Sequence, residues 1–469
     1  MHTSTTSTVP LVSWTAAQLL EATQGYWLND QAPNTEIKRI LTDSRDAEAG
    51  DAFLALKGER FDAHAFITQV AEQGCQVAIV SQPIDAEICQ LVVPDTRLAL
   101  GQLGAYRRAQ NPQLKVIALT GSSGKTTTKE MLGSILSRIA PTLVTRGNLN
   151  NDLGVPVMLL ELRPEHQYAV MELGASHQGE IDYTSNLVQP LVAGIINIGT
   201  AHLGEFGGRD GICRAKSEIY AHIAPNGTSI VPAADDFADS IRQAVQTEQV
   251  LSFGAGGEIF ATEIELQAQS ATFKLNTPQG VHQVNLPFAG EHNVQNATAA
   301  AAFALAIGIS LDDIVLGLEQ AVGAKGRLNF IQQGRHLLID DTYNANPTSM
   351  RAAAEVLAQQ EGVRVMVMGD IGELGSSAAQ QHYMLGRDLV SVKGLNFVVA
   401  VGEFAPAAQE GARSTQYGKK MQAFLTQEQA LPFLLSLIET HQPQSMSFLF
   451  KGSRYTHMET LMADLMEKL

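Results

Sequence analysis

A short run of glycine, serine, lysine and threonine lies where an apolar stretch of the chain gives way to a helical pattern. The residues that follow the apolar stretch 115–120 are Gly121, Ser122, Ser123, Gly124, Lys125, Thr126 and Thr127. Glycines let backbone N–H groups turn inward as an anion-binding nest, and the N-terminus of the helix expected over 125–139 adds partial positive charge. Lys125 supplies a full charge, and the Thr126 hydroxyl can ligate Mg²⁺. This order of strand, loop and helix predicts binding of the triphosphate of ATP.

The loop departs from the full Walker A pattern, because Leu119 stands where the first glycine of that pattern belongs. The alternative interpretation is a glycine-rich turn with a solvated lysine. The strand before the loop, the helix after it and the Lys-Thr pair favour nucleotide binding.

Two further residues follow apolar strands and could hold metal ions. Glu172 ends the run 168–171, where a carboxylate can hold the Mg²⁺ of a nucleotide bound to the phosphate loop. His202 follows the run 195–198, on the edge where sites form in parallel sheets. A histidine in that place can equally be a structural hydrogen-bonding group. Lys216 lies in a helical pattern, where an isolated lysine is usually a solvated charge, and its spacing gives no further signal.

Composition limits the partners of the chain. Lys and Arg number 32 against 48 Asp and Glu, so the net charge of −16 repels polyanions, and we expect no nucleic-acid partner. The longest apolar stretch, 297–309, is shorter than the ~20 residues that span a bilayer, and residues 1–14 lack the pattern of a secretory signal, so we expect no membrane insertion. Cys75, Cys89 and Cys213 are far apart and odd in number, which argues against disulfides or a zinc site and fits a reducing cytoplasm.

The chain of 469 residues is longer than one hydrophobic core supports, and its pattern changes divide it into three α/β domains. Residues 1–112 form a small unit that ends at Asn111-Pro112. Residues 113–323 alternate apolar strands with helices, as in a mostly parallel sheet, and period-two alternation on either side of the turn at 277–280 predicts an antiparallel hairpin at one edge of that sheet. Residues 324–469 again alternate strands and helices, which predicts a Rossmann-like doubly wound domain.

Motifs spread along the whole chain resemble the Mur ligases, and they occur in the order found in that family. They are the phosphate loop 121–127, Gly147-Asn148-Leu149-Asn150-Asn151-Asp152-Leu153-Gly154, Glu172-Leu173-Gly174, His202-Leu203, Ala215-Lys216-Ser217-Glu218, Gly290-Glu291-His292-Asn293, Gly326-Arg327 and Asp341-Thr342-Tyr343-Asn344-Ala345-Asn346-Pro347. The segments 148–151 and 341–347 are similar to those of the members that add D-alanyl-D-alanine. Such a member joins the dipeptide to a UDP-linked muramoyl tripeptide at the cost of ATP.

The resemblance implies roles that the pattern alone cannot supply. Lys216 corresponds to a lysine that CO₂ converts to a carbamate, which would bind a second Mg²⁺ together with His202, while Thr126 and Glu172 bind the first. Asn148 would join Lys125 among the catalytic residues. Asn293 and Asn296 match positions near adenine, although two asparagines at a helix start can also be caps.

In the C-terminal domain Arg327 would contact phosphate and Asp341 the ribose, and this domain would complete the ATP site. A surface arginine and a capping aspartate are the alternatives. Tyr343, Asn344 and Asn346 could face the incoming dipeptide because of their place in the loop.

The N-terminal segments Thr42-Asp43-Ser44-Arg45 and Ala55-Leu56-Lys57-Gly58 resemble the uridine-nucleotide domain of the family. Ser44, Arg45 and Lys57 would therefore bind the uridine diphosphate, although Asp43-Ser44-Arg45 could equally form a turn and helix cap. We expect a monomer that acts on small molecules.

Two rival functions remain open at this stage. A nucleotide-dependent switch would carry an Asn-Lys-x-Asp motif, which the central domain lacks. Another amide ligase, such as a third-residue-adding Mur ligase or a folylpolyglutamate synthetase, is the second rival. The Asp-Asn-Pro-Arg motif of the third-residue-adding enzyme is absent, and the segments at 44–45 and 343–346 argue against folate.

Overall fold

The computed structural model describes residues 12–58, 61–200 and 203–469, so that His202 lies outside the described residues. The chain divides into two compact units. The first comprises Met1–Ala118, Ala140–Ala175 and Glu180–Pro190, and the second comprises Leu119–Ile139, Ser176–Gly179 and Leu191–Leu469. The expected α/β fold is confirmed throughout.

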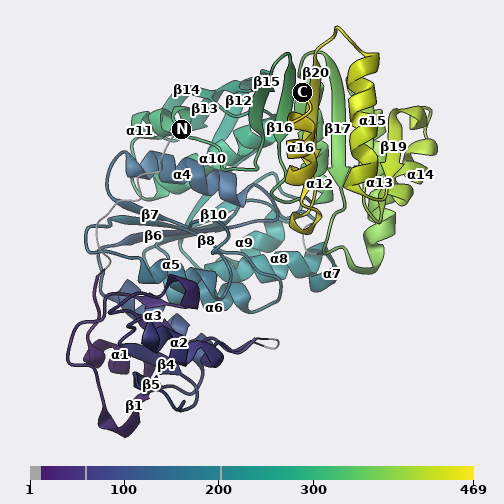
Figure 1. Ribbon diagram of the computed structural model, residues 1–469. Helices are drawn as coiled ribbons and strands as arrows, with labels where there is room; N and C mark the ends of the chain where they lie inside the picture. Colours follow the sequence, from purple (N-terminus) through teal and green to yellow (C-terminus); the bar gives the residue numbers. More distant parts are fainter. Residues whose placement is uncertain (1–11, 59–60, 201–202) are drawn as a thin grey trace. The chain divides into compact units, whose positions relative to one another are not determined.

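The first unit is built on a five-stranded sheet in the order β1-β5-β4-β3-β2, of which Figure 1 labels β1, β5 and β4. The strands are β1 (Tyr26–Trp27), β2 (Ile40–Leu41), β3 (Ala52–Leu54), β4 (Val77–Val80) and β5 (Cys89–Val92). Only β1 is antiparallel to its neighbour. One face packs around Trp14, Leu19 and Leu100, and the other around Phe53, Ile67 and Val70.

Helix α3 (Thr96–Ala109) is the longest helix of this unit, and it begins where the Asp95 side chain accepts hydrogen bonds from the N–H groups of Arg97 and Leu98. It packs beside α5 (Gly154–Leu160) and α6 (Glu180–Val188). A β-carbon at Gly101 would lie 1.9 Å from the Tyr183 hydroxyl, so a larger residue would require the Tyr183 side chain to move. Helices α1 (Ala16–Thr23) and α2 (Ile67–Glu72) complete the N-terminal part.

A six-stranded sheet has the order β11-β10-β9-β6-β8-β7. Its strands are β6 (Lys115–Thr120), β7 (Thr142–Val144), β8 (Tyr168–Glu172), β9 (Val192–Ile195), β10 (Thr228–Pro232) and β11 (Gln249–Phe253). The pairs β7–β8, β9–β10 and β10–β11 are parallel. All residues of β8, β9 and β10 are buried, which explains their uninterrupted apolar sequences.

Three antiparallel strands of the second unit form a sheet of their own: β12 (Phe260–Leu266), β13 (Ala271–Thr277) and β14 (Gly280–Leu286). The predicted hairpin around residues 277–280 is confirmed, but its predicted place at an edge of the parallel sheet is wrong. Alternating residues such as Phe273 and Leu275 are buried on one face, and β14 packs beside α11 (Leu311–Glu319). The alternation fixes the pairing of the strands but not the sheet that they join.

Helices of the second unit carry the residues of interest. Helix α4 (Lys125–Ser137) follows β6 and packs against α10 (Glu291–Ala306) and α11. Gly317 of α11 permits this contact, because a β-carbon there would lie 2.5 Å from the Ile135 Cα of α4. The shorter helices α7 (Leu203–Phe206), α8 (Arg209–Ser217) and α9 (Ala238–Ala244) follow β9 and β10.

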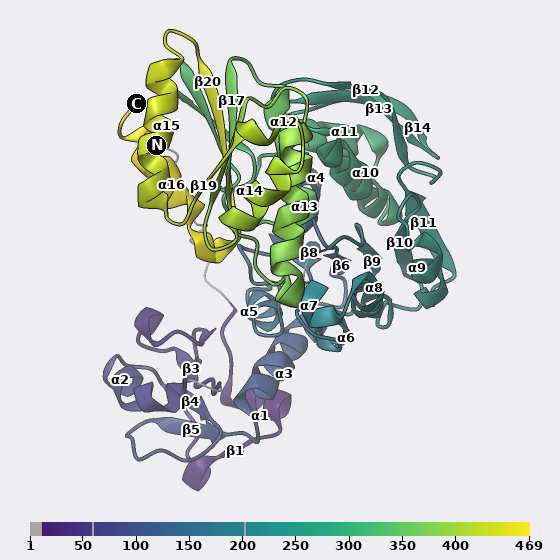
Figure 2. The same ribbon diagram turned by 90° about the vertical axis from the view of Figure 1, so that its right-hand side faces the viewer.

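The C-terminal sheet has the order β15-β16-β20-β17-β18-β19, with β15 (Asn329–Gln333) antiparallel and the others parallel. The parallel strands are β16 (His336–Asp340), β17 (Val363–Gly369), β18 (Phe397–Val401), β19 (Met421–Phe424) and β20 (Met446–Lys451). Helices α12 (Pro347–Ala358), α13 (Ala378–Ser391) and α14 (Ala405–Arg413) share one core with the sheet (Figure 2). Helices α15 (Gln427–Thr440) and α16 (Met458–Met466) share the other core, which confirms the doubly wound prediction.

Candidate active site

The phosphate loop lies between β6 and α4, as predicted. Gly124 is the N-cap of α4 and has a φ of 77°, a left-handed conformation that favours glycine. A β-carbon at this position would lie 2.2 Å from the Asn296 Oδ1 of α10. The Lys125 ammonium donates to the Gly121 carbonyl at 2.8 Å. The loop is therefore a tight turn with its cationic side chain folded over it.

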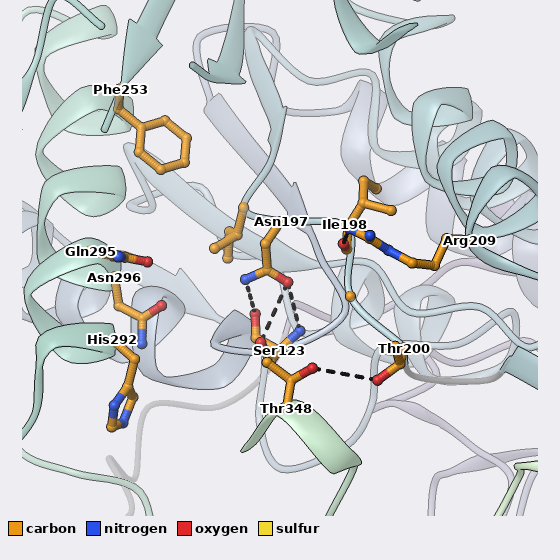
Figure 3. Close-up of a pocket in the computed structure, with 12 residues that line it drawn as sticks. Ser123, Asn197, Ile198, Thr200, Arg209, Phe253, His292, Gln295, Asn296 and Thr348 are labelled. Carbon is orange, nitrogen blue, oxygen red and sulfur yellow. Dashed lines mark hydrogen bonds between the residues drawn. The ribbon is translucent and has the colours of Figure 1, made fainter. Parts of the chain in front are cut away.

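Asn197, two residues beyond the end of β9, contacts the same loop (Figure 3). Its Oδ1 accepts hydrogen bonds from Ser122 N at 3.2 Å and from Ser123 N at 3.0 Å, and its Nδ2 donates to Ser123 O at 3.0 Å. The sequence predicted no role for Asn197. A polar residue in the otherwise apolar run 195–198 was the signal that could have identified it.

A cavity of about 380 Å³ opens beside the loop (Figure 3). Its lining includes Ser123, Asn197, Arg209, Phe253, His292, Gln295 and Asn296, together with Ile196, Ile198, Gly199, Thr200 and Thr348. One wall is thus apolar and aromatic, and α10 contributes amide and imidazole groups. The volume lies in the range of small-molecule sites.

The two predicted adenine contacts differ in their places. Asn296 lines the cavity, whereas Asn293 is not among the lining residues. Asn293 instead donates to Ala289 O at 2.8 Å and accepts from the Asn296 Nδ2 at 3.1 Å. Asn293 therefore orients Asn296, and sequence reasoning missed Phe253, His292 and Gln295.

The pKa of His292 differs from the ordinary value of a histidine. Burial lowers its pKa to about 4, although the nearby carboxylate of Asp341 opposes the shift. The imidazole is therefore neutral at physiological pH and can both donate and accept a hydrogen bond.

Glu172 is buried at the end of β8 in the first unit, with 1 % of its surface exposed. Its Oε1 accepts from the Asn150 Nδ2 at 2.8 Å, and its backbone N–H donates to the Thr145 hydroxyl at 2.9 Å. Asn148, which the family resemblance singled out, is exposed and its carbonyl accepts from Asn150 N. The amide that contacts Glu172 is thus that of Asn150, two residues further along.

Lys216 lies on α8 and has only 2 % of its surface exposed, so it is not a solvated surface lysine. Across the residues that the structure describes, no three His, Cys, Asp or Glu side chains gather as a metal site. The carboxylate of Glu172 and the hydroxyl of Thr126 are nevertheless oxygen donors that suit Mg²⁺, which proteins bind with one or two carboxylates while substrate phosphates supply further ligands.

The loop that follows β16 is held by a buried ion pair. Lys451, the last residue of β20, places its Nζ 2.6 Å from Asp341 Oδ2 and 2.9 Å from Asn344 O. Burial lowers the pKa of Lys451 even though Asp341 favours the charged form. Lys451 was absent from the predicted site, and its contacts with residues more than a hundred positions away carry no local sequence signal.

Three further predicted residues of this domain, Arg327, Tyr343 and Asn346, lie near Asp341 in the sequence. The Arg327 guanidinium stacks over the Tyr343 ring at 4.5 Å. Asn346 is the N-cap of α12, where its side chain accepts from Ser349 N, and its Nδ2 lies 3.5 Å from Ser122 O of the phosphate loop. The loop 341–347 therefore lies within the same unit as the phosphate loop.

In the first unit two of the predicted uridine-nucleotide residues, Arg45 and Lys57, carry exposed charges. Arg45 is 85 % exposed in its side chain and pairs with Asp43, and this hydrogen bond lowers the pKa of Asp43 to about 2. The Asp43 side chain also accepts from Arg45 N at the start of the short turn that contains Ser44. Lys57 Nζ lies 3.6 Å from Asp62 Oδ2.

Comparison with known proteins identifies the family. Three family profiles match consecutive parts of the chain: the Mur ligase family catalytic domain over residues 36–118, the Mur ligase middle domain over 119–304, and the Mur ligase glutamate ligase domain over 326–454. The UDP-N-acetylmuramoyl-tripeptide–D-alanyl-D-alanine ligase of Escherichia coli K12 is 41% identical over 461 residues, which cover 97% of this chain and 99% of that protein. The chain belongs to the Mur ligase family.

Solved structures agree with this Mur ligase assignment. MurF from Acinetobacter baumannii is 76% identical with a TM-score of 0.95, and the match covers 98% of this chain and 100% of that one. MurF from Thermotoga maritima, solved in complex with ADP, is 26% identical with a TM-score of 0.80 over 92% and 97% of the two chains. The predicted three-domain α/β fold of a Mur ligase is thereby confirmed. Across its described residues, this Mur ligase has no helix with the length and apolarity that crossing a bilayer requires.

Proposed function

We propose that this chain is an ATP-dependent ligase that joins D-alanyl-D-alanine to UDP-N-acetylmuramoyl-tripeptide and so forms the pentapeptide precursor of peptidoglycan. The observation that carries the proposal is the likeness over nearly the whole chain to relatives that bear this activity in their names, together with a phosphate loop beside a cavity of nucleotide size. One such relative was solved with ADP, which supports ATP as the energy source.

The reaction needs activation because a carboxylate is a poor electrophile. The terminal carboxylate of the tripeptide attacks the γ-phosphorus of ATP, which forms an acyl phosphate and releases ADP. The unprotonated amine of D-alanyl-D-alanine then attacks the acyl carbon, inorganic phosphate leaves, and the amine loses its proton as the amide forms. Lys125 would pair with the phosphate oxygens during the first step.

Residues of this chain would hold the ions that accompany the nucleotide. Thr126 and Glu172 would bind one Mg²⁺, and His202 with a carbamate on Lys216 would bind the second. Bound Mg²⁺ neutralises charge on the transferring phosphoryl group. Carbamylation joins CO₂ to the Lys216 amine with loss of a proton, and the burial of the Lys216 side chain is compatible with a role inside the site instead of on the solvated surface.

The three domains would divide the work. Residues 1–112 would bind the uridine nucleotide through Ser44, Arg45 and Lys57, and residues 113–323 would bind ATP. Residues 324–469 would complete the ATP site with Arg327 and Asp341 and receive the dipeptide near Tyr343, Asn344 and Asn346. Asn148 would assist catalysis from its exposed turn. We place this reaction, carried out by a monomer, in the cytoplasm, which suits three cysteines without disulfide partners.

Phosphate release from ATP with the UDP-tripeptide, measured with and without D-alanyl-D-alanine, tests the proposal. We expect release to depend on the dipeptide and to match the amide product mole for mole. Phosphate release that does not depend on the dipeptide and is not accompanied by an amide product would refute the proposed function. Lys125→Ala should abolish ATP turnover, and retained turnover would contradict the phosphate-loop assignment.

A further inference from the structure

The side chain of Asn197 is hydrogen-bonded to both polar groups of one residue in the phosphate loop. It accepts from Ser123 N at 3.0 Å and donates to Ser123 O at 3.0 Å, so that a ring of two hydrogen bonds joins amide and backbone. Ser122 N also donates to the Asn197 side chain, at 3.2 Å, and to the Asn197 carbonyl at 3.1 Å. The pairing between β6 and β9, which includes the bond from Ile196 N to Thr120 O, thereby continues into the loop.

Only an amide of this length provides such a ring. The asparagine side chain carries one acceptor and one donor group in a plane, as a peptide group does. An aspartate would accept from the two N–H groups but would turn a second oxygen toward the Ser123 carbonyl. A leucine of similar shape would leave the loop N–H groups of Ser122 and Ser123 without this acceptor.

Two further contacts within the second unit confine the phosphate loop next to Asn197. Gly121 packs against the segment that follows β9, where an added β-carbon would lie 3.1 Å from the Ile196 Cβ. On the other side Gly124 lies against Asn296, which Asn293 orients. The N–H groups of Ser122 and Ser123 both donate to Asn197, so a side chain outside the loop sets the direction of these two groups.

We propose that Asn197 is a positioning residue that holds the phosphate loop in the shape that receives the β-phosphate of the nucleotide. The inference rests on the proposed use of ATP and goes beyond it, because it assigns the preorganisation of the loop to a residue outside the loop. Fixing a binding loop beforehand strengthens binding by reducing the entropy that the ligand must remove.

Binding of adenosine and of ADP to the full-length Asn197→Leu variant tests this role, since the two ligands differ by the diphosphate. We expect ADP to bind roughly tenfold more weakly or worse, a loss of about 1.4 kcal/mol, while adenosine binding changes by less than about twofold. Asn197→Asp keeps the acceptor but loses the donor and adds a negative charge near the phosphates, so its selective loss of ADP affinity should be at least as large as that of Asn197→Leu.

Asn276→Leu is the matched control. The Asn276 amide is also half-buried and donates to three oxygens, but these lie in the three-stranded antiparallel sheet. This variant should lose comparable stability in thermal unfolding yet bind both ligands as the wild type does.

Three outcomes would overturn the inference. The first is ADP binding by both Asn197 variants that equals that of the wild type. The second is an equal loss of adenosine and ADP, which would mean that Asn197 shapes the cavity as a whole. The third is a selective loss of ADP in Asn276→Leu as well. A wild-type chain that binds no ADP would instead refute the proposed function, and this inference with it.

Discussion

Replacement of Lys451 by methionine removes one partner of the buried ion pair that holds the loop after β16. The Lys451 Nζ lies 2.6 Å from Asp341 Oδ2, and the two side chains are only 2 % and 8 % exposed. Methionine fills much of the same volume but cannot donate to Asp341 or to the Asn344 carbonyl. Asp341 would keep the Leu328 N–H, at 3.3 Å, as a contact for its other oxygen.

The expected cost follows from leaving a carboxylate buried without its counter-charge. Removing one partner of a buried pair typically costs about 3–5 kcal/mol of unfolding free energy. Because burial outweighs Asp341 in setting the Lys451 pKa, desolvation of the pair is itself costly. The double variant Lys451→Met, Asp341→Asn removes both charges, so we expect it to recover all but about 1 kcal/mol of that loss.

Urea unfolding followed by circular dichroism can measure this change. The transition should move to lower urea in Lys451→Met and return most of the way to the wild-type midpoint in the double variant. A single variant within about 1 kcal/mol of the wild type, or a double variant as unstable as the single, would refute the reasoning.

Three further predictions concern His292, Lys216 and Asn150. Because burial lowers the His292 pKa to about 4 from an ordinary 6.5, the unfolded chain takes up this proton first. The stabilisation is complete above pH 6.5 and is lost as the pH falls through 4, so His292→Gln should flatten this part of a plot of unfolding free energy against pH, by on the order of 1–3 kcal/mol. Lys216→Ala should abolish turnover and regain part of it with small carboxylates such as formate, whereas full activity in the variant would remove the carbamate from the scheme. Asn150→Ala should raise the Mg²⁺ concentration for half-maximal turnover by roughly 10–100-fold, because its amide orients Glu172, and an unchanged Mg²⁺ titration would contradict this.

The elements that the sequence predicted best are those whose signal lies in one uninterrupted stretch of residues. Strands β6, β8, β17 and β20 are nearly or fully buried, so each is a mostly apolar run with helical patterns on either side, interrupted within β17 by Arg364 and within β20 by Ser447. The antiparallel strands were recognised by alternation, which fixes the face of each residue. Alternation does not say whether a hairpin extends a parallel sheet or closes its own, and that choice depends on packing against α10 and α11.

The predicted and the unpredicted residues of the site also differ in whether their signal lies within one segment of the sequence. The phosphate loop is one uninterrupted segment, and each of its residues has a role that the strand and helix beside it suggest. The roles of Asn197, Asn150 and Lys451 arise from partners 74, 22 and 107 residues away. A single sequence contains no record of such contacts, and the family resemblance directed attention to the neighbouring Asn148 and Asp341 instead.

Asparagine side chains recur as the supports of this site, and electrostatics gives a reason. Asn197 and Asn296 lie against the phosphate loop within the second unit. A carboxylate at position 197 could accept the same two N–H groups, but it would add a negative charge beside a polyphosphate in a chain whose net charge is already −16. A lysine would add a charge that competes with Lys125 for the phosphates. A neutral amide such as that of Asn197 both donates and accepts, so it fixes the loop without adding a charge of its own next to that of Lys125.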